Sequence, residues 1–204
     1  EDRGLLAGGV MNAGEKAEKL GLPGITNSVE DVIAARDILL AKETGVKLHL
    51  CHCSTADSVA LVRFGKSLGV RLSAEVCPHH FAMTEDDIPG DDANYKMNPP
   101  LRARADVDAL IAGLSDGTME VIATDHAPHS AEEKKRSFLD APFGIVGSET
   151  AFALSYTALV KAGHLTLPQL VEKLSVNPAR ILGIDKGDIS VGHTADLVVA
   201  DVEH

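Results

Sequence analysis

The fold of this chain is decided by the stretch MEVIATDHAPH, residues 119–129. Its apolar pair Val121-Ile122 lies in a short run that ends in polar residues, as a buried parallel strand does. Asp125 follows the run, and His126 and His129 come one and four positions later. An acid and imidazoles at the carboxyl end of a parallel strand are typical of the catalytic face of an α/β barrel. The alternative is a turn that happens to contain two histidines.

Strands and helices alternate on the N-terminal side of this stretch. Runs rich in β-branched and apolar residues predict three strands, at 46–53, 70–77 and 119–123. Helical spacing of apolar residues predicts three helices, at 28–44, 54–68 and 105–114, with caps from Asn27 or Ser28 and from Ser54 or Thr55. Repeated βαβ units indicate an α/β fold with a parallel sheet.

The remaining segments give less regular patterns. Residues 1–27 carry weak signals, and 78–103 and 130–147 are predicted to be long loops. Further helices are predicted at 148–162, after Thr166, and at 177–183, followed by a turn and a strand. Three parallel strands cannot close a barrel, so we expect part of a larger protein in which the 46–53 strand lacks a partner on one edge.

Composition limits the class of protein. The 204 residues carry a net charge of -11, which argues against a nucleic-acid surface. No apolar run approaches a membrane span, and no signal peptide opens the chain. Three cysteines do not suggest a disulfide framework, so we expect a reducing, cytoplasmic location.

His52 ends the 46–53 strand as Asp125 ends the 119–123 strand, so both are expected at the same edge of the sheet. Strand alternation puts His52 on one face with Leu48 and Leu50, and puts Cys51 and Cys53 on the other face. If the face of His52 is that of the site, the two cysteines pack toward the helices as small buried residues. A zinc site built from Cys51, Cys53 and His49 is the alternative, but it needs a fourth ligand that the sequence does not supply.

Histidine and aspartate together suit a hydrolytic zinc, because they leave a coordination position for water. An aspartate that binds the metal through one oxygen has a second oxygen with which to take a proton. The pair His79-His80 has two readings. Either one of them lines the site, or both order the loop that follows the 70–77 strand.

The sequence resembles the C-terminal half of the bacterial dihydroorotases of the amidohydrolase superfamily. The matching stretches occur in the family's order along nearly the whole chain. They are 22–25 (LPGI), 52–55 (HCST), 74–76 (AEV), 78–80 (PHH), 95–102 (YKMNPPLR), 123–129 (ATDHAPH), 141–144 (APFG) and 147–151 (GSETA).

This resemblance implies a (β/α)8 TIM barrel of the metal-dependent hydrolase type, of which only the later βα units are present here. Residues 1–183 would form the C-terminal half of the barrel, and 184–204 the start of the return into a small β domain. The implied activity is zinc-dependent, reversible hydrolysis of L-dihydroorotate to N-carbamoyl-L-aspartate in pyrimidine biosynthesis. A homodimer associated with aspartate carbamoyltransferase would be the expected assembly, without nucleic acid or membrane.

The resemblance also implies roles for four residues and a backbone segment. His52 would be a metal ligand at the end of barrel strand six, and Asp125, at the end of strand eight, both metal ligand and general base. Asn98 and His129 would bind substrate together with the backbone at Phe143-Gly144. Asn98 and His129 can both donate hydrogen bonds to an anionic, carbonyl-rich substrate.

Several family positions have no counterpart in this sequence. The His-x-His pair of strand one, the substrate-binding Arg and Asn that follow it and the acidic ligand of strand four are absent. The strand-five histidine would lie just before Glu1. The chain would therefore supply two of the six metal ligands of a binuclear zinc site.

Two other functions compete with this reading. Dihydropyrimidinases and allantoinases share the Pro-Pro-Leu-Arg stretch and the aspartate, but Met97-Asn98 and His129 favour the dihydroorotases. A non-catalytic subunit that scaffolds aspartate carbamoyltransferase should have lost its site residues. In this sequence all four are present, namely His52, Asn98, Asp125 and His129.

Overall fold

Three parallel strands form the main sheet of the computed structural model, which describes residues 1–203. They are β3 (Leu48–Leu50), β4 (Leu72–Val76) and β5 (Val121–Ile122), and they lie side by side in that order. Leu50 pairs with Ala74, and Val76 pairs with Ile122. The predicted parallel βαβ arrangement is confirmed, although each strand is shorter than the sequence pattern suggested.

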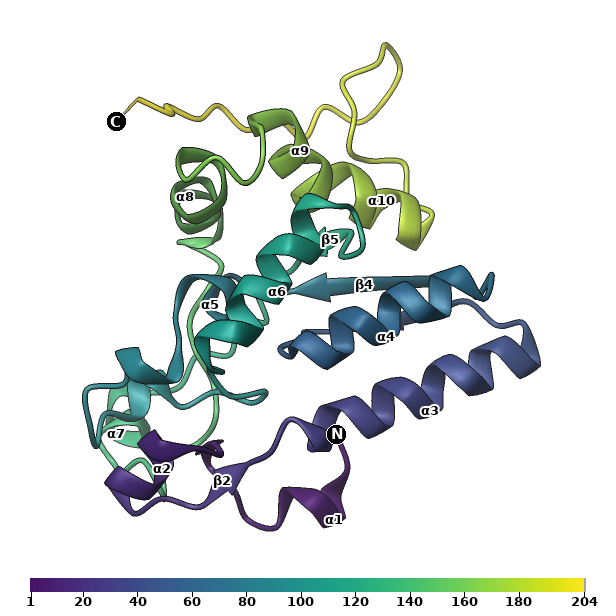
Figure 1. Ribbon diagram of the computed structural model, residues 1–204. Helices are drawn as coiled ribbons and strands as arrows, with labels where there is room; N and C mark the ends of the chain where they lie inside the picture. The colour runs from purple at the N-terminus through teal and green to yellow at the C-terminus, as the bar shows by residue number, and fades with distance from the viewer. Residues whose placement is uncertain (204) are drawn as a thin grey trace.

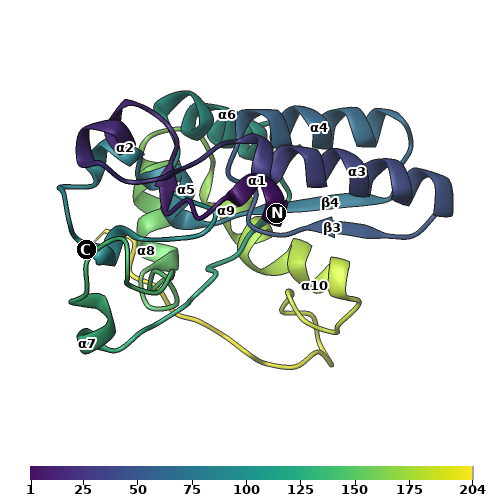
Figure 2. The same ribbon diagram turned by 90° about the horizontal axis from the view of Figure 1, so that it is seen from below.

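Three long helices cover one face of this sheet. They are α3 (Ser28–Thr44), α4 (Ala56–Ser67) and α6 (Arg104–Ser115), and Figure 2 shows α3 and α4 along the same side of β3 and β4. Alternate residues of β4 point into the core between sheet and helices. All three predicted helices are confirmed within two residues at each end.

The ends of α3 and α4 follow from local chemistry. The Thr55 hydroxyl accepts a hydrogen bond from the Ser58 N–H at 3.0 Å and so caps α4 as predicted. Helix α3 ends at Gly45, which has the left-handed φ of 70° that glycine tolerates best. The predicted side-chain cap from Asn27 is wrong. Its amide instead donates to Asp106 Oδ1 at 3.0 Å and joins α3 to α6.

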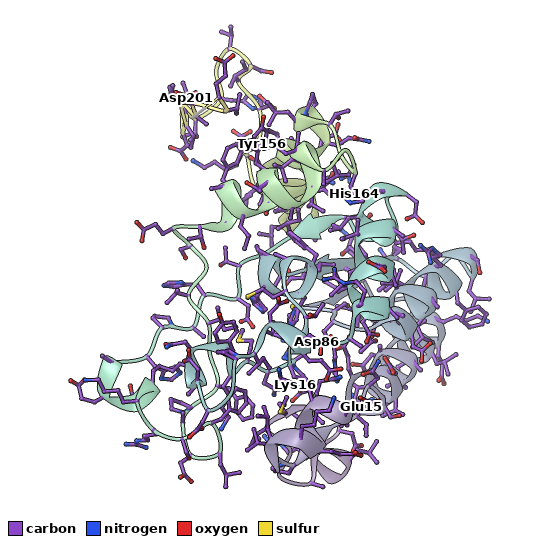
Figure 3. The ribbon with its side chains drawn as sticks, turned by 60° about the vertical axis from the view of Figure 1, so that its left-hand side comes forward. Glu15, Lys16, Asp86, Tyr156, His164 and Asp201 are labelled. Atoms are coloured by element: carbon purple, nitrogen blue, oxygen red, sulfur yellow. The ribbon has the colours of Figure 1, made fainter. Side chains whose placement is uncertain are left out.

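The first 27 residues contain more structure than their sequence indicated. They form α1 (Arg3–Leu6), β1 (Met11–Asn12), α2 (Glu15–Leu20) and β2 (Gly24–Ile25), and the two short strands pair in parallel. The Lys16 ammonium on α2 donates to the Asp86 carbonyl at 3.4 Å (Figure 3). Tertiary contacts of this kind, rather than periodicity, hold the segment in place.

The two predicted loops also contain short helices. Residues 78–103 include α5 (Pro78–Ala82), η1 (Glu85–Asp87) and η2 (Ala93–Tyr95), and 130–147 includes α7 (Ala131–Lys134). The expectation of irregular loops was wrong at these places. Helices of three to five residues are too short for a periodic signal. They depend on caps such as the reciprocal Ser130–Glu133 capping box at α7.

The C-terminal helices pack near β5, and the chain then leaves them. They are α8 (Ala151–Ser155), η3 (Tyr156–Lys161), α9 (Leu167–Val171), η4 (Glu172–Val176) and α10 (Asn177–Leu182). Residues 184–203 contain no strand and run away from the sheet (Figure 1). The predicted strand is therefore wrong for this structure. Val191, Val198 and Val199 lie fully in solvent, because this segment pairs with none of the described strands.

None of the helices within residues 1–203 is both long enough and apolar enough to cross a bilayer.

Candidate active site

His52 and Asp125 share an unusual backbone conformation. Their φ angles are 41° and 46°, and within residues 1–203 Ala7 is the only other residue besides glycine with a positive φ. His52 follows the end of β3, and Asp125 follows the end of β5. Such angles are disfavoured by side-chain sterics and concentrate at functional sites. The two predicted metal ligands therefore leave their strands in the same strained way.

The turn at His52 changes which residues face the helices. Leu48 and Leu50 pack against the helix-side core, so the expectation that they share the face of the site is wrong. Cys53 is buried in that core as expected, but Cys51 is exposed on the other face. The positive φ of His52 interrupts the strand alternation between the two cysteines. A Cys-x-Cys zinc site is therefore not formed.

The side chains of His52 and Asp125 make no hydrogen bond or ion pair within the described part of the chain. Both residues are partly accessible. An imidazole and a carboxylate that stand unpaired at the same edge of a sheet are suited to binding a metal ion. Groups of three potential ligands occur elsewhere among residues 1–203, but none includes His52 or Asp125. His52 and Asp125 therefore keep the accessible side chains that the predicted metal ligands need.

Glu75, on β4 between these two strand ends, was not predicted as a site residue. Its Oε1 accepts the backbone N–H of His52 at 3.2 Å, and its Oε2 lies 2.9 Å from His49 Nε2. Burial alone would raise the pKa of the Glu75 carboxyl, but the hydrogen bond and charge of His49 and the His52 N–H lower it overall. Glu75 therefore contacts both His49 and the backbone of His52 at its left-handed turn.

Cys77 connects the region of Glu75 with that of Asp125. Burial raises the pKa of its thiol, and the charges of Asp125 and Glu75 raise it further. The same two carboxylates raise the pKa of the Cys51 thiol, after burial. Cys51, Cys77 and Asp125 all follow the carboxyl ends of the parallel strands β3, β4 and β5, which places them at the same edge of the sheet.

Asn98 lies beside the first residue of the chain. Its amide donates to Glu1 Oε2 at 2.6 Å, and its Oδ1 is buried without a hydrogen-bond partner in residues 1–203. The Asn98-Pro99 peptide bond is cis. An unpaired buried oxygen next to a donating amide is an arrangement that a polar ligand can complete.

His129, Phe143 and Gly144, the other predicted substrate residues, are brought together. His129 Nε2 donates to the Phe143 carbonyl at 3.0 Å. At Gly144, φ is 151°, and an added Cβ would lie 2.3 Å from the Ala127 carbonyl oxygen. The Gly144 N–H donates to the Lys96 carbonyl at 2.9 Å. Glycine is therefore needed at position 144, where the chain passes close to the loop that follows Asp125.

Three other histidines near the site, at positions 79, 80 and 126, are buried or hydrogen-bonded to neighbouring segments of the chain. His126 Nδ1 accepts the N–H groups of Gly147 and Ser148 at 3.0 and 3.3 Å, so it orders that turn. His80 Nε2 donates to the Pro99 carbonyl at 2.9 Å. Burial, followed by the charge of His52, lowers the pKa of His79 to about 4. His79 is therefore a neutral, buried neighbour of the predicted ligand.

Arg102 is a structural residue that sequence reasoning did not single out. Its guanidinium is 1% exposed and donates to Ser54 Oγ at 3.1 Å and to Asn12 Oδ1 at 3.0 Å. It also donates to the Ile25 carbonyl at 3.1 Å and lies 3.8 Å from Glu30. Arg102 therefore joins both short strands to the starts of α3 and α4, and a buried arginine needs such partners.

Comparison with known proteins places these features in a family. The sequence profile of the amidohydrolase family matches residues 10–204. A dihydroorotase of Enterococcus faecalis is 55% identical over 202 residues, which are 99% of this chain and 47% of that protein. A dihydroorotase of Bacillus caldolyticus is 54% identical over 203 residues, 100% of this chain and 48% of that protein. The chain spans about half the length of the curated relatives it matches.

Solved structures agree with the fold. A D-hydantoinase (dihydropyrimidinase) from Thermus sp. superposes with a TM-score of 0.80 at 29% identity, over 91% of this chain and 42% of that chain. The dihydropyrimidinase of Brevibacillus agri gives a TM-score of 0.79 at 26% identity, over 95% of this chain and 43% of that chain.

Proposed function

Since this chain belongs to the amidohydrolase family, we propose that it forms part of the catalytic barrel of a dihydroorotase. Residues 1–183 supply the later βα units of a (β/α)8 barrel, and 184–204 begin the return into a small β domain. The enzyme interconverts L-dihydroorotate and N-carbamoyl-L-aspartate. The observation that carries the proposal is identity of 50 to 55% to dihydroorotases over 99% of the chain or more.

Zinc fits the residues that the chain contributes. His52 and Asp125 are the two that would hold it, because both follow parallel strands and neither side chain makes a hydrogen bond or ion pair within residues 1–203. When bound, zinc polarises the carbonyl group that is attacked and makes water a better nucleophile at neutral pH. The other ligands must come from strands outside this sequence.

Asp125 has the central role in proton transfer. In the hydrolytic direction, the oxygen of water bonds to the ring carbonyl carbon, and the bond from that carbon to the ring nitrogen breaks. A carboxylate oxygen of Asp125 takes the proton from the attacking water and delivers it to the leaving ring nitrogen. The products are a new carboxylate and a carbamoyl group on the same molecule, and the reverse steps close the ring.

Asn98, His129 and the backbone at Phe143-Gly144 bind the substrate in this proposal. The Asn98 amide and the His129 imidazole now have intramolecular partners, Glu1 and the Phe143 carbonyl, and would exchange them for the anionic substrate. Gly144 allows the segment to approach the loop after Asp125 closely. A cytoplasmic homodimer associated with aspartate carbamoyltransferase is part of the same proposal.

The second candidate is a dihydropyrimidinase or allantoinase. The structural likeness to hydantoinases favours this class, but at 26 to 29% identity for the two structures above it is more distant. The full-length enzyme should hydrolyse dihydroorotate, and it should act on dihydrouracil and allantoin at least a hundredfold less efficiently. More efficient hydrolysis of dihydrouracil or allantoin than of dihydroorotate would instead assign the protein to the dihydropyrimidinases or allantoinases.

A non-catalytic scaffold subunit is the remaining alternative. The retention of His52, Asn98, Asp125 and His129 argues against it. A purified full-length protein that lacks dihydroorotate turnover when loaded with zinc, yet binds aspartate carbamoyltransferase, would favour the scaffold.

A further inference from the structure

Three side chains with metal-binding atoms lie together where β4 ends and α5 begins. Cys77, His79 and His80 each offer one ligand atom, and these atoms all lie within 4.8 Å of one another. The exposed fractions of the three residues are 0%, 3% and 1%. In a tetrahedral zinc site, bond lengths of about 2.3 Å to sulfur and 2.0 Å to nitrogen place the donor atoms about 3.3–3.5 Å apart. These side chains would therefore have to turn inward by about an ångström to bind one ion.

Two imidazole nitrogens in this cluster have no partner. Among residues 1–203, His79 Nε2 and His80 Nδ1 are buried without a hydrogen bond. His80 Nε2 donates to the Pro99 carbonyl at 2.9 Å, so a neutral His80 carries its proton there and keeps a lone pair on Nδ1. Metal-binding histidines typically donate their other nitrogen to a carbonyl in this way. The cluster thus has the donors and the orienting contact of a metal site.

A second group of potential ligands lies nearby but is already saturated. It consists of His49, Cys51 and Glu75. His49 Nδ1 lies 2.7 Å from Ser73 Oγ, and its Nε2 lies 2.9 Å from Glu75 Oε2. The other Glu75 oxygen accepts the His52 N–H. Neither nitrogen of His49 is free for a metal, so this group is the weaker candidate.

We propose that Cys77, His79 and His80 together bind one zinc ion or another thiophilic divalent cation. These three ligands do not include His52 or Asp125, which are assigned above to the catalytic zinc. Three protein ligands leave one position of a tetrahedral ion for water or a small anion. His79 also lines a cavity of about 440 Å³ beside Gly147 and Thr150, which gives such a ligand a route to the ion. Through His80, the ion would fix the end of β4 against Pro99.

Cobalt substitution in the full-length protein tests this site directly. The protein is stripped with a chelator and loaded with Co²⁺, which gives a near-ultraviolet charge-transfer band only when a thiolate binds it. We expect the band in the wild type. Cys77→Ser should abolish it and lower the bound cobalt by one ion per chain. Cys53→Ser and Cys51→Ser should keep both, because Cys53 is buried outside the cluster and Cys51 belongs to the saturated group.

Two outcomes would overturn the proposal: no charge-transfer band in the wild type, or a band that survives Cys77→Ser in a folded protein. If Cys77→Ser does not fold, His80→Gln replaces it and should weaken cobalt binding at this site at least tenfold; unchanged binding counts against the site. X-ray absorption at the zinc edge needs no variant. It should show sulfur at about 2.3 Å, and nitrogen and oxygen alone would contradict the proposal. None of these readouts requires turnover, so the result is independent of the dihydroorotase assignment.

Discussion

At the scale of single residues, Asp125 combines a strained backbone with an unpaired carboxylate. Its φ is 46°, and its side chain has no hydrogen bond or ion pair within residues 1–203. Aspartate and asparagine tolerate the left-handed region better than most residues. The strand end can therefore keep its shape when the carboxylate is replaced by an amide, which makes a clean test of the chemistry possible.

We predict that Asp125→Asn in the full-length enzyme leaves the fold intact and lowers kcat by at least about a hundredfold, because an amide cannot act as a base. It should also weaken zinc binding. Steady-state kinetics, metal analysis and circular dichroism measure the three properties. Asp116→Asn, at an exposed ion pair with Arg63, is the control and should retain activity. Turnover of Asp125→Asn within tenfold of wild type would refute the role assigned to this residue.

Substitution of Asn98 or His129 should weaken substrate binding and leave metal binding unchanged. We predict that Asn98→Ala and His129→Ala each raise KM for dihydroorotate about tenfold or more, since a hydrogen bond to a charged group is lost. Zinc content should stay unchanged. Kinetics and metal analysis on the same preparations provide the measurement. If either variant loses zinc, that residue belongs to the metal site and our assignment is wrong.

At the scale of elements, close backbone contacts hold the 141–147 segment against the loop after Asp125. The isolated parallel bridge between His126 and Ile145 joins them, and Gly144 sits at the tightest point. We predict that Gly144→Ala lowers kcat/KM at least tenfold, because its Cβ would clash with the Ala127 carbonyl. Gly163→Ala is the matched control. It also has a positive φ, but its Cβ would meet no atom within 4 Å, so it should affect stability and not kcat/KM.

The guanidinium of Arg102 connects the strands β1 and β2 to the starts of α3 and α4. We predict that Arg102→Met lowers the free energy of unfolding by about 3–5 kcal/mol, because Glu30 and Asn12 lose a buried partner. Arg63→Met, which removes the exposed pair with Asp116, should cost less than about 1 kcal/mol. Denaturant unfolding of the full-length protein compares the two. Equal effects would show that the buried network does not stabilise the fold.

At the scale of the whole molecule, the main sheet has two unpaired outer edges. Among the described residues, β3 and β5 each pair with β4 alone. A cavity of about 270 Å³ opens along β3, lined by residues that include Ile33, Leu48 and His52. Val46, just before β3, is 54% exposed. Strand edges of this kind are normally covered in native proteins, and the relatives are about twice as long as this chain.

We predict that residues 1–204 expressed alone neither turn over dihydroorotate nor assemble a binuclear zinc centre. A catalytic zinc needs about three protein ligands, and His52 and Asp125 supply only two. Zinc stoichiometry is best measured on the Cys77→Ser variant of this chain, so that the separate site proposed above does not contribute. Two tightly bound zinc ions per chain with normal turnover would require a new assignment of the ligands.

The sequence alone determined the βαβ order, the parallel sheet and the strand-end positions of His52 and Asp125, because strand periodicity and glycine stops are local signals. It also indicated the family through stretches that run along nearly the whole chain. Only the tertiary structure decided the roles of Glu75 and Arg102, whose partners lie on other elements. It also separated Cys51 from Cys53 through the left-handed turn at His52. Periodicity cannot register these features, since they depend on contacts between distant residues and on one φ angle.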